Sequence, residues 1–366
     1  MMTQRSAGDS GHPRLLVVRN DKLGDFMLSW PALACLKASD AAPHVSALVP
    51  SYTAPLARQC PWIDEVLIDP GDASGREGRR ELLHRLREAS FDALLTLFST
   101  PRIGRLGWQA GIPLRLAPAT KWAQLFYNRR IVQRRSRSKK PEYLYNLELA
   151  EALLKELGLK VPVRPEPPYW PLPDGTRKAQ RERIADELGL ETSRLWLFLH
   201  PGSGGSAVNL SLERYANLVL AVEAQLAEAS RHAPIWVLTA GPGEGAAIDF
   251  LRTRLLDKSV TAHLLPPRHG LDDFALSLSA ADLFIAGSTG PLHIAGCLDR
   301  PTAGFYPARR SATPLRWQTC NAEAHRLAFC PPPGAGERDM DSIDIEAAAG
   351  RIADHLRHFP TCETTP

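Results

Sequence analysis

The sequence lacks several features that would each point to a particular class of protein. No apolar run approaches the ~18 uninterrupted residues that a membrane-spanning helix needs, so no transmembrane helix is expected. The six cysteines form no CxxC pair and no close Cys/His cluster, which argues against a metal site and against a disulfide scaffold. The first apolar run leads into RNDKLGD instead of GxGxxG, which disfavours a nicotinamide-dependent enzyme.

Charge is modest overall but concentrated in one stretch. The formal net charge of +4 is too small to indicate a nucleic-acid-binding protein, and no nucleic-acid partner is expected. Seven cations nevertheless lie close together: Arg129, Arg130, Arg134, Arg135, Arg137, Lys139 and Lys140. Such a basic run is either a solvated loop or a surface for a polyanionic substrate or an anionic membrane. Aromatic residues lie just upstream, but no recognised nucleic-acid motif accompanies them.

Length and proline content divide the chain into two domains. With 366 residues the chain is long enough for two cores, and the proline-rich segment 161–175 is typical of an extended linker. We expect a disordered start over 1–12, an N-terminal domain over 13–165 and a C-terminal domain over 166–340. Residues 341–366 are expected to contain a C-terminal helix, which can pack on the C-terminal domain or return to the N-terminal domain. Residues 1–12 lack the apolar segment of a signal peptide, so a cytoplasmic location is expected.

Apolar runs of strand length alternate with segments of helical periodicity, which predicts a parallel sheet in each half. The first half is expected to contain strands at 14–18, 44–50, 65–69 and 92–98, with helices at about 27–37, 81–89 and 141–159. The second half is expected to contain strands at 195–199, 234–241, 261–266, 282–287 and 302–307, with helices at 176–189, 211–229, 245–256, 271–280, 290–298 and 345–359. The fold class is therefore α/β, with two doubly wound domains and a ligand cleft outside the carboxyl ends of the strands.

Two turns at strand ends are suited to binding phosphate. The turn HPGSGGSAVN at 200–209 lies between an apolar strand and a helix, so backbone N–H groups and the helix N-terminus can face an anion. The segment GSTGPLH at 287–293 repeats this arrangement, with hydroxyl groups at Ser288 and Thr289 and N–H groups at 289, 290 and 292. Together the two turns predict a diphosphate site. His293 is either a phosphate partner or a buried structural imidazole.

Two carboxylates occupy similar strand-end positions. Asp25 follows Gly24 in the first turn and either caps the next helix or serves as a general base. Lys22 lies in the same turn and can support the site electrostatically. Glu244 in TAGPGE either accepts hydrogen bonds from a ribose diol or stabilises a helix N-terminus.

Five segments together resemble the motif series of the ADP-heptose:lipopolysaccharide heptosyltransferase family. They are RNDKLGDFMLSWPAL at 19–33, KPEYLYNLELAEAL at 140–153, HPGSGGSAVNLSLERY at 200–215, GPGE at 241–244 and GSTGPLHIAGCLDRPTAGFYP at 287–307. Their order and spacing agree with the family pattern over nearly the whole chain.

The resemblance implies a GT-B fold of two Rossmann-like domains, with the acceptor bound mainly by the N-terminal domain and the nucleotide-sugar by the C-terminal domain. It also implies an inverting glycosyltransferase that moves a heptose or a related sugar from an ADP-linked donor, uses no metal and no cofactor apart from that donor, and has Asp25 as the base. The donor-binding residues that it implies, together with the strand-end turns, are Ser203, Gly204, Gly205, Asn209, Glu244, Ser288, Thr289, Gly290 and His293. The expected acceptor is an anionic glycolipid of the lipopolysaccharide core, met at the cytoplasmic face of the inner membrane. The acceptor-binding candidates are Lys22, Arg129, Arg130, Arg134 and Arg135.

The sequence departs from the family pattern at two positions. Val208 stands where many relatives carry lysine, so a cation expected near the leaving group is missing. Ser288 stands where some relatives carry aspartate. The residues that can replace the missing cation are Arg268, Arg309, Arg310 and Lys22. Two alternatives follow: a GT-B protein that binds a nucleotide-sugar with weak or no transfer, and a transferase that uses a different nucleotide-sugar.

Overall fold

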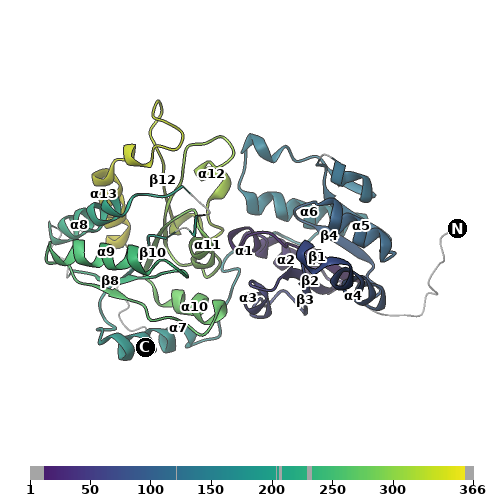
Figure 1. Ribbon diagram of the computed structural model, residues 1–366, viewed down its shortest axis with the longest axis horizontal. Helices are drawn as coiled ribbons and strands as arrows, with labels where there is room; N and C mark the ends of the chain where they lie inside the picture. Colours follow the sequence, from purple (N-terminus) through teal and green to yellow (C-terminus); the bar gives the residue numbers. More distant parts are fainter. Residues whose placement is uncertain (1–11, 121, 203, 206–207, 229–232, 359–366) are drawn as a thin grey trace. The chain divides into compact units, whose positions relative to one another are not determined.

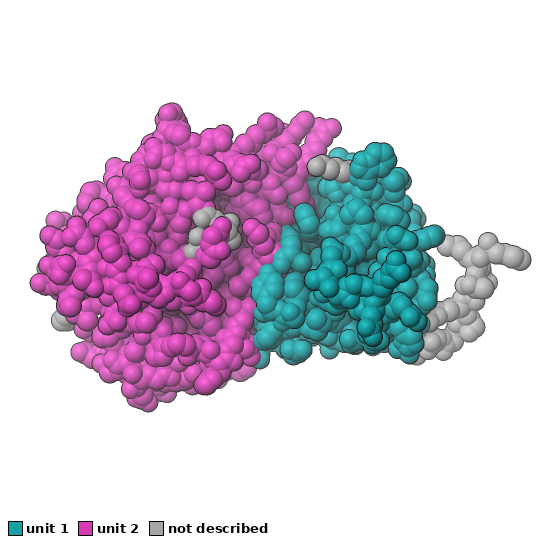
Figure 2. Space-filling model, in the orientation of Figure 1, with its two compact units in different colours: residues 1–21, 29–133, 144–165 teal, residues 22–28, 134–143, 166–366 magenta. Residues whose placement is uncertain are grey.

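The computed structural model describes residues 12–120, 122–202, 204–205, 208–228 and 233–358. The chain divides into two compact units (Figure 1, Figure 2). Unit 1 comprises residues 1–21, 29–133 and 144–165, and unit 2 comprises residues 22–28, 134–143 and 166–366. The main division follows Pro165, in the proline-rich segment. Two short segments of the first half, 22–28 and 134–143, belong to unit 2.

Unit 1 is built on a parallel sheet of order β3-β2-β1-β4-β5-β6. Its strands are β1 (Arg14–Val18), β2 (His44–Pro50), β3 (Glu65–Asp69), β4 (Ala93–Thr96), β5 (Leu114–Pro118) and β6 (Arg129–Ile131). The helices of this half are α2 (Trp30–Lys37), α3 (Ala54–Arg58), α4 (Gly75–Glu88), α5 (Pro101–Gln109) and α6 (Glu142–Glu156), with the short 3-10 helix η2 (Trp122–Phe126). Helices cover the sheet, so its central strands β1 and β4 consist mainly of buried apolar residues.

Unit 2 repeats the plan with the order β12-β11-β10-β7-β8-β9. Its strands are β7 (Trp196–His200), β8 (Ile235–Leu238), β9 (Ala262–Leu264), β10 (Leu283–Gly287), β11 (Thr302–Phe305) and β12 (Arg326–Phe329). Its helices are α1 (Leu23–Met27), α7 (Thr176–Leu188), α8 (Leu212–Glu228), α9 (Gly245–Leu256), α10 (Leu271–Ser277), α11 (Gly290–Cys297), α12 (Pro314–Trp317) and α13 (Ile345–His358). In both sheets the order reverses next to the first strand, at β1/β4 and at β7/β10, and such switch points are where ligands of doubly wound sheets bind.

The predicted alternation of strands and helices is confirmed, with local differences. The structure adds β5, β6, α3 and α5 to the first half and α12 and β12 to the second. The interpretation of 129–140 as a loop is wrong at its start, because Arg129–Ile131 pairs with β5; two exposed arginines in a three-residue strand leave no apolar alternation to detect. The helix expected at about 27–37 begins at Trp30 as α2, and a separate short helix that was not expected, α1, precedes it.

The C-terminal helix α13 packs against α8, and its apolar residues join the core of unit 2. The structure thereby gives the helix a definite place, whereas the sequence left the choice of domain open. No helix among the described residues is long and apolar enough to cross a membrane.

Candidate active site

The switch point of unit 2 brings the two predicted phosphate turns together. Strands β7 and β10 are neighbours, and His200 pairs with Ala286, so the two strands end at the same level of the sheet. The chain after β7 leads to α8, and the chain after β10 leads directly into α11. Both turns therefore flank one place at the carboxyl edge of the sheet.

The backbone of the first turn requires glycine at two positions. Gly204 and Gly205 have φ angles of 52° and 70°, in the left-handed region that favours glycine. Asn209 holds the turn from its other end: Nδ2 donates to the carbonyl of Pro201 at 2.9 Å, and Oδ1 accepts from the Tyr215 hydroxyl at 2.6 Å. Asn209 therefore shapes the turn with its own side chain. The predicted donor ligand Ser203 lies outside the described residues.

Glu244 connects this turn to the turn after β8. Its Oε1 accepts from the Gly204 N–H at 2.9 Å and its Oε2 from the Gly241 N–H at 2.7 Å. Although Glu244 is the N-cap residue of α9, its side chain makes no capping bond to that helix. The imidazole Nε2 of buried His200 lies 3.8 Å from Oε2. Burial lowers the pKa of His200, although the nearby Glu244 carboxylate acts in the opposite direction. The lowered pKa favours the neutral imidazole.

The N-terminus of α11 presents two buried polar atoms that have no hydrogen-bond partner among the described residues, Thr289 Oγ1 and His293 Nδ1. Thr289 is the N-cap residue of α11 but makes no side-chain capping bond. Burial lowers the pKa of His293 to about 4, so this imidazole is neutral at physiological pH. The Thr289 N–H, one of the three expected to face a diphosphate, donates instead to the carbonyl of Gly287 at 2.7 Å.

Helix α1 carries Asp25 and packs directly on α11. Asp25 lies in the first turn of α1 and is not its N-cap residue, so the capping interpretation of this carboxylate is wrong. The helices approach so closely that a Cβ atom on Gly24 would lie 2.8 Å from His293 Cδ2, and one on Gly290 would lie 2.6 Å from Leu23 Cδ2. Asp25, half-buried, thus belongs to the same unit as both phosphate turns.

The candidate replacements for the missing lysine differ in availability. Val208 itself packs against the hydrophobic core of unit 2. The side chain of Arg268 is buried and is bound through Nη1 to Glu187 of α7. Arg309 and Arg310 are exposed and follow β11, the neighbour of β10, on the same edge of the sheet. Lys22 is exposed and is the N-cap residue of α1.

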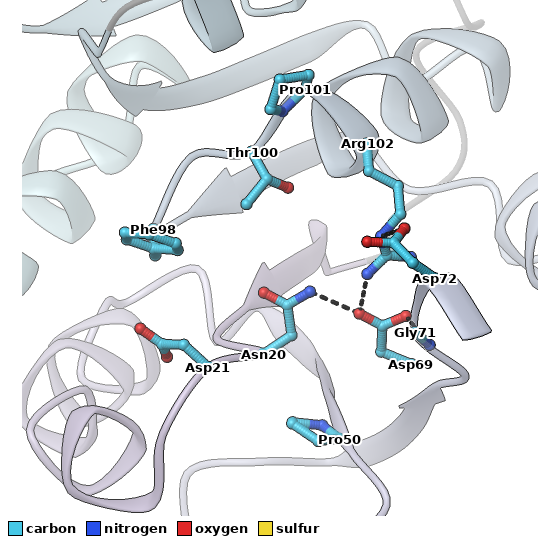
Figure 3. A pocket seen from close by; sticks show the side chains of 10 residues that line it. All are labelled: Asn20, Asp21, Pro50, Asp69, Gly71, Asp72, Phe98, Thr100, Pro101 and Arg102. Atoms are coloured by element: carbon cyan, nitrogen blue, oxygen red, sulfur yellow. Dashed lines mark hydrogen bonds and ion pairs between the residues drawn. The ribbon is translucent and has the colours of Figure 1, made fainter. Parts of the chain in front are cut away.

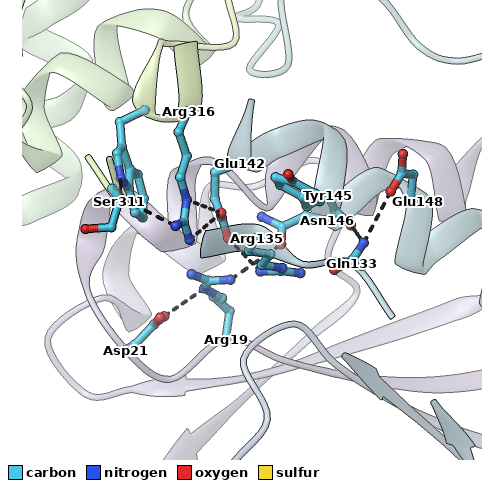
Figure 4. Close-up of polar contacts among 11 residues, drawn as sticks. Arg19, Asp21, Gln133, Arg135, Glu142, Tyr145, Asn146, Glu148, Ser311 and Arg316 are labelled. Carbon is cyan, nitrogen blue, oxygen red and sulfur yellow. Dashed lines mark hydrogen bonds and ion pairs between the residues drawn. The ribbon is translucent and has the colours of Figure 1, made fainter. Parts of the chain in front are cut away.

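Carboxylates engage Arg129 and Arg135 among the cations of 129–140. Arg135 Nη1 lies 2.6 Å from Oε1 of buried Glu142, whose Oε2 accepts from Arg316 Nε at 3.2 Å (Figure 4). Arg129 pairs with the carboxylate at the end of α6. The other two acceptor candidates in this stretch are exposed, namely Arg130 and Arg134.

Unit 1 has a cavity of about 520 Å³ at its own switch point (Figure 3). Its lining comes from the ends of β1 to β4: Asn20, Asp21, Pro50, Asp69, Gly71, Asp72, Phe98, Thr100, Pro101 and Arg102. Buried Asp69 is the centre of its polar contacts and accepts from Asn20 Nδ2 at 2.5 Å, from the Gly71 N–H at 3.0 Å and from Arg102. Burial opposes ionisation, but these bonds outweigh it and lower the pKa of Asp69.

Three important residues of this cavity are not among those predicted from the sequence. Asp69 ends a predicted strand, so the reasoning applied to other strand-end carboxylates could have found it. Phe98 also ends a predicted strand, but a single aromatic residue there is no motif. Arg102 lies in α5, which the sequence pattern did not predict.

Comparisons with known proteins agree with the motif series. The sequence model described as "Glycosyltransferase family 9 (heptosyltransferase)" matches residues 79–328. A protein of Haemophilus influenzae named "Putative glycosyltransferase" is 45% identical over 347 residues, covering 94% of this chain and 97% of that protein. Lipopolysaccharide heptosyltransferase 2 of Escherichia coli is 23% identical over 312 residues, covering 82% and 85% of the two chains.

Solved structures share the fold. The structure of E. coli ADP-heptose lipopolysaccharide heptosyltransferase II has a TM-score of 0.71 at 19% identity, covering 94% of this chain and 99% of that one. The family 9 glycosyltransferase of Veillonella parvula has a TM-score of 0.76 at 15% identity, covering 95% and 98%. These similarities and the two parallel six-stranded sheets identify the GT-B fold. The chain belongs to glycosyltransferase family 9 and is a glycosyltransferase.

Proposed function

We propose that this enzyme moves a heptose or a related sugar from an ADP-linked donor to a lipopolysaccharide core or a similar glycan, with inversion and without a metal ion. The observation that carries the proposal is the packing of α1 on α11, which places Asp25 in the same unit as the two phosphate turns. The names of the relatives support the sugar and the acceptor class.

In the proposed reaction, an acceptor hydroxyl attacks C1 of the donor sugar as the bond from C1 to the diphosphate oxygen breaks. The Asp25 carboxylate takes the hydroxyl proton, and the diphosphate leaves with the bonding electrons. A single displacement of this kind inverts the configuration at C1. Exposed Lys22, Arg309 and Arg310 and the N-terminus of α11 are the groups that would stabilise the departing charge.

The polar groups of the donor turns support a role in binding the nucleotide-sugar. The unsatisfied Thr289 Oγ1 and His293 Nδ1 are atoms for which a bound donor would supply a partner. Glu244 and Asn209 hold the first turn in shape, and in the proposal Glu244 also meets the ribose. Within the described ranges, no three His, Cys, Asp or Glu side chains are grouped so as to hold a metal ion.

We also propose that the acceptor is an anionic glycolipid, met by peripheral association with the cytoplasmic face of the inner membrane. In unit 1, Trp122, Leu125 and Val132 are 80%, 68% and 72% exposed. Trp122 and Leu125 lie on η2, and Val132 directly follows β6. Both η2 and β6 contact β5, and β6 carries the exposed Arg129 and Arg130. Exposed tryptophan beside arginine suits the interface of an anionic bilayer.

The proposal is tested by replacing the base and by varying the nucleotide. Asp25→Asn should lower transfer from ADP-heptose by at least about 10²-fold while thermal stabilisation by ADP is retained, because only the proton acceptor is lost. Exposed Asp40→Asn is the control and should retain transfer. Undiminished transfer in Asp25→Asn would remove Asp25 as the base.

The same samples separate the two alternatives. Stronger stabilisation by UDP or GDP than by ADP would indicate a different nucleotide-sugar and overturn the ADP assignment. Stabilisation by ADP without transfer to a broad panel of acceptors would favour a nucleotide-sugar-binding protein.

A further inference from the structure

The cavity at the switch point of unit 1 has the composition of a carbohydrate pocket. Its volume of about 520 Å³ lies within the ~300–1,000 Å³ typical of small-ligand sites. Phe98 lies at the rim of the cavity and is 51% exposed, whereas phenylalanine side chains are usually buried. The face of an aromatic ring is electron-rich and apolar, so it can pack against the C–H face of a sugar ring. Figure 3 shows Phe98 beside the cavity, with Asn20 and Arg102 among the polar side chains that line it.

The charges of this pocket are already paired within the protein. Arg102 is bound by buried Asp69 through one guanidinium nitrogen and by Asp72 through Nε at 3.1 Å. Asp21 pairs with Arg19 at 2.8 Å. The lining side chains therefore carry three carboxylates but only one guanidinium, and that guanidinium faces two of the carboxylates.

This charge distribution decides which sugar the pocket can accept. A carboxylate or phosphate on the ligand would meet more negative than positive charge and would have to compete with Asp69 and Asp72 for Arg102. Hydroxyl groups face no such penalty, because they can donate to Asp72 and to the Asn20 carbonyl and accept from the remaining N–H groups of Arg102.

We infer that the pocket of unit 1 binds an uncharged, hydroxyl-rich pyranose of the acceptor, with Phe98 as the stacking platform and the pairing of Arg102 as the device that excludes anionic sugars. The inference rests on the proposed glycosyl transfer and deepens it by naming the chemistry of the acceptor sugar. An anionic glycolipid can still carry its charges elsewhere.

The inference is tested by saturation-transfer NMR with methyl glycosides of glucose, mannose and galactose, each compared with the uronate in which a carboxylate replaces the C6 hydroxymethyl group. At least one neutral glycoside should give a signal about five-fold above that of its uronate. Phe98→Ala should abolish this signal, whereas Phe250→Ala, at a 45% exposed phenylalanine of α9 in unit 2, should retain it.

Releasing the guanidinium should change the preference. Asp69→Asn, and independently the 89% exposed Asp72→Asn, should raise the uronate signal about two-fold or more, because Arg102 loses an anionic partner. Asp72→Asn keeps the test valid if the buried substitution prevents folding. Equal or preferred binding of uronates by the unmodified enzyme, no saturation transfer to any neutral glycoside, or unchanged binding in Phe98→Ala would overturn the inference.

Stabilisation by ADP is measured on the same samples. If it persists while the sugar results fail, only the acceptor inference is lost. If ADP does not stabilise the unmodified enzyme, the proposed function fails independently of the sugar results.

Discussion

Gly24 lies against the imidazole of His293, and a Cβ atom at position 24 would come within 2.8 Å of the ring carbon Cδ2. The glycine brings the turn that carries Asp25 into contact with the first helical residues after β10. The Cys297 thiol reinforces the same contact by donating to the carbonyl of Met27 at 3.3 Å. The base assigned in the proposal is thereby tied by packing to the predicted phosphate turn at 287–293.

Adding a methyl group at position 24 should separate the two helices. Gly24→Ala is expected to lower the free energy of unfolding by about 1–3 kcal/mol, because a fully buried imidazole must move. Transfer should fall more than ADP binding, since Asp25 moves relative to the donor turn. Denaturant unfolding and transfer assays measure both effects.

The control is Gly350→Ala in α13, where a Cβ atom meets open space. This variant should gain up to ~1 kcal/mol from helix propensity and keep its activity. Equal free energies of unfolding and equal transfer activities in the two variants would contradict the packing role of Gly24.

Loss of one carboxylate oxygen at position 244 should loosen the first donor turn. Glu244→Gln keeps a single acceptor and cannot serve the N–H groups of both Gly204 and Gly241. We expect the dissociation constant for ADP to rise about ten-fold, measured by calorimetry. Glu213→Gln, at an exposed ion pair on α8, should leave the constant unchanged. A tight ADP complex in Glu244→Gln would show that the turn does not need this bridge.

Burial of His293 should make stability depend on pH. The pKa of the imidazole is about 4 in the folded protein and about 6.5 when unfolded. Between these values the unfolded chain binds the extra proton, so the free energy of unfolding falls as pH drops from 6.5 to 4, by about 3 kcal/mol in total. Above pH 6.5 this contribution is fully present.

The measurement is denaturant unfolding across this pH range. His293→Asn should reduce the pH slope by close to one proton, while the 68% exposed His84→Gln should retain it. The other buried imidazoles, such as His200, are the same in both proteins. The difference between the two pH slopes therefore reports the titration of His293 alone. An unaltered slope in His293→Asn would contradict a depressed pKa.

The exposed apolar side chains of η2 should anchor the enzyme to anionic lipid. Trp122→Ser combined with Leu125→Ser is expected to lower co-sedimentation with phosphatidylglycerol vesicles by about ten-fold or more, through loss of buried apolar area. The 66% exposed Leu256→Ser on α9 is the matched control. Equal binding of all three proteins, or binding to pure phosphatidylcholine as well as to phosphatidylglycerol, would argue against this surface.

Much of the fold is visible in local sequence patterns. The strands at 14–18, 44–50 and 65–69 were predicted with the bounds that the structure shows, because buried parallel strands are continuous apolar runs between turn residues. The strand β6 was missed because two exposed arginines give it no apolar pattern, and its pairing with β5 is a property of the sheet. The glycines at 204 and 205 were similarly visible, because their chain conformation is a local property.

By itself, the sequence determined the family, the alternation of strands and helices, and the strand-end positions of Asp25, Glu244 and Thr289, since each is written in neighbouring residues. Only the tertiary structure decided that α1 joins the unit of the two predicted phosphate turns, that Glu244 bridges two turns, and that Asp69 pairs with Arg102 in the pocket of unit 1. The contact between α1 and α11 joins residues 270 positions apart. Such contacts arise when whole elements pack, and the periodicity of a single segment carries no record of which distant segment will cover it.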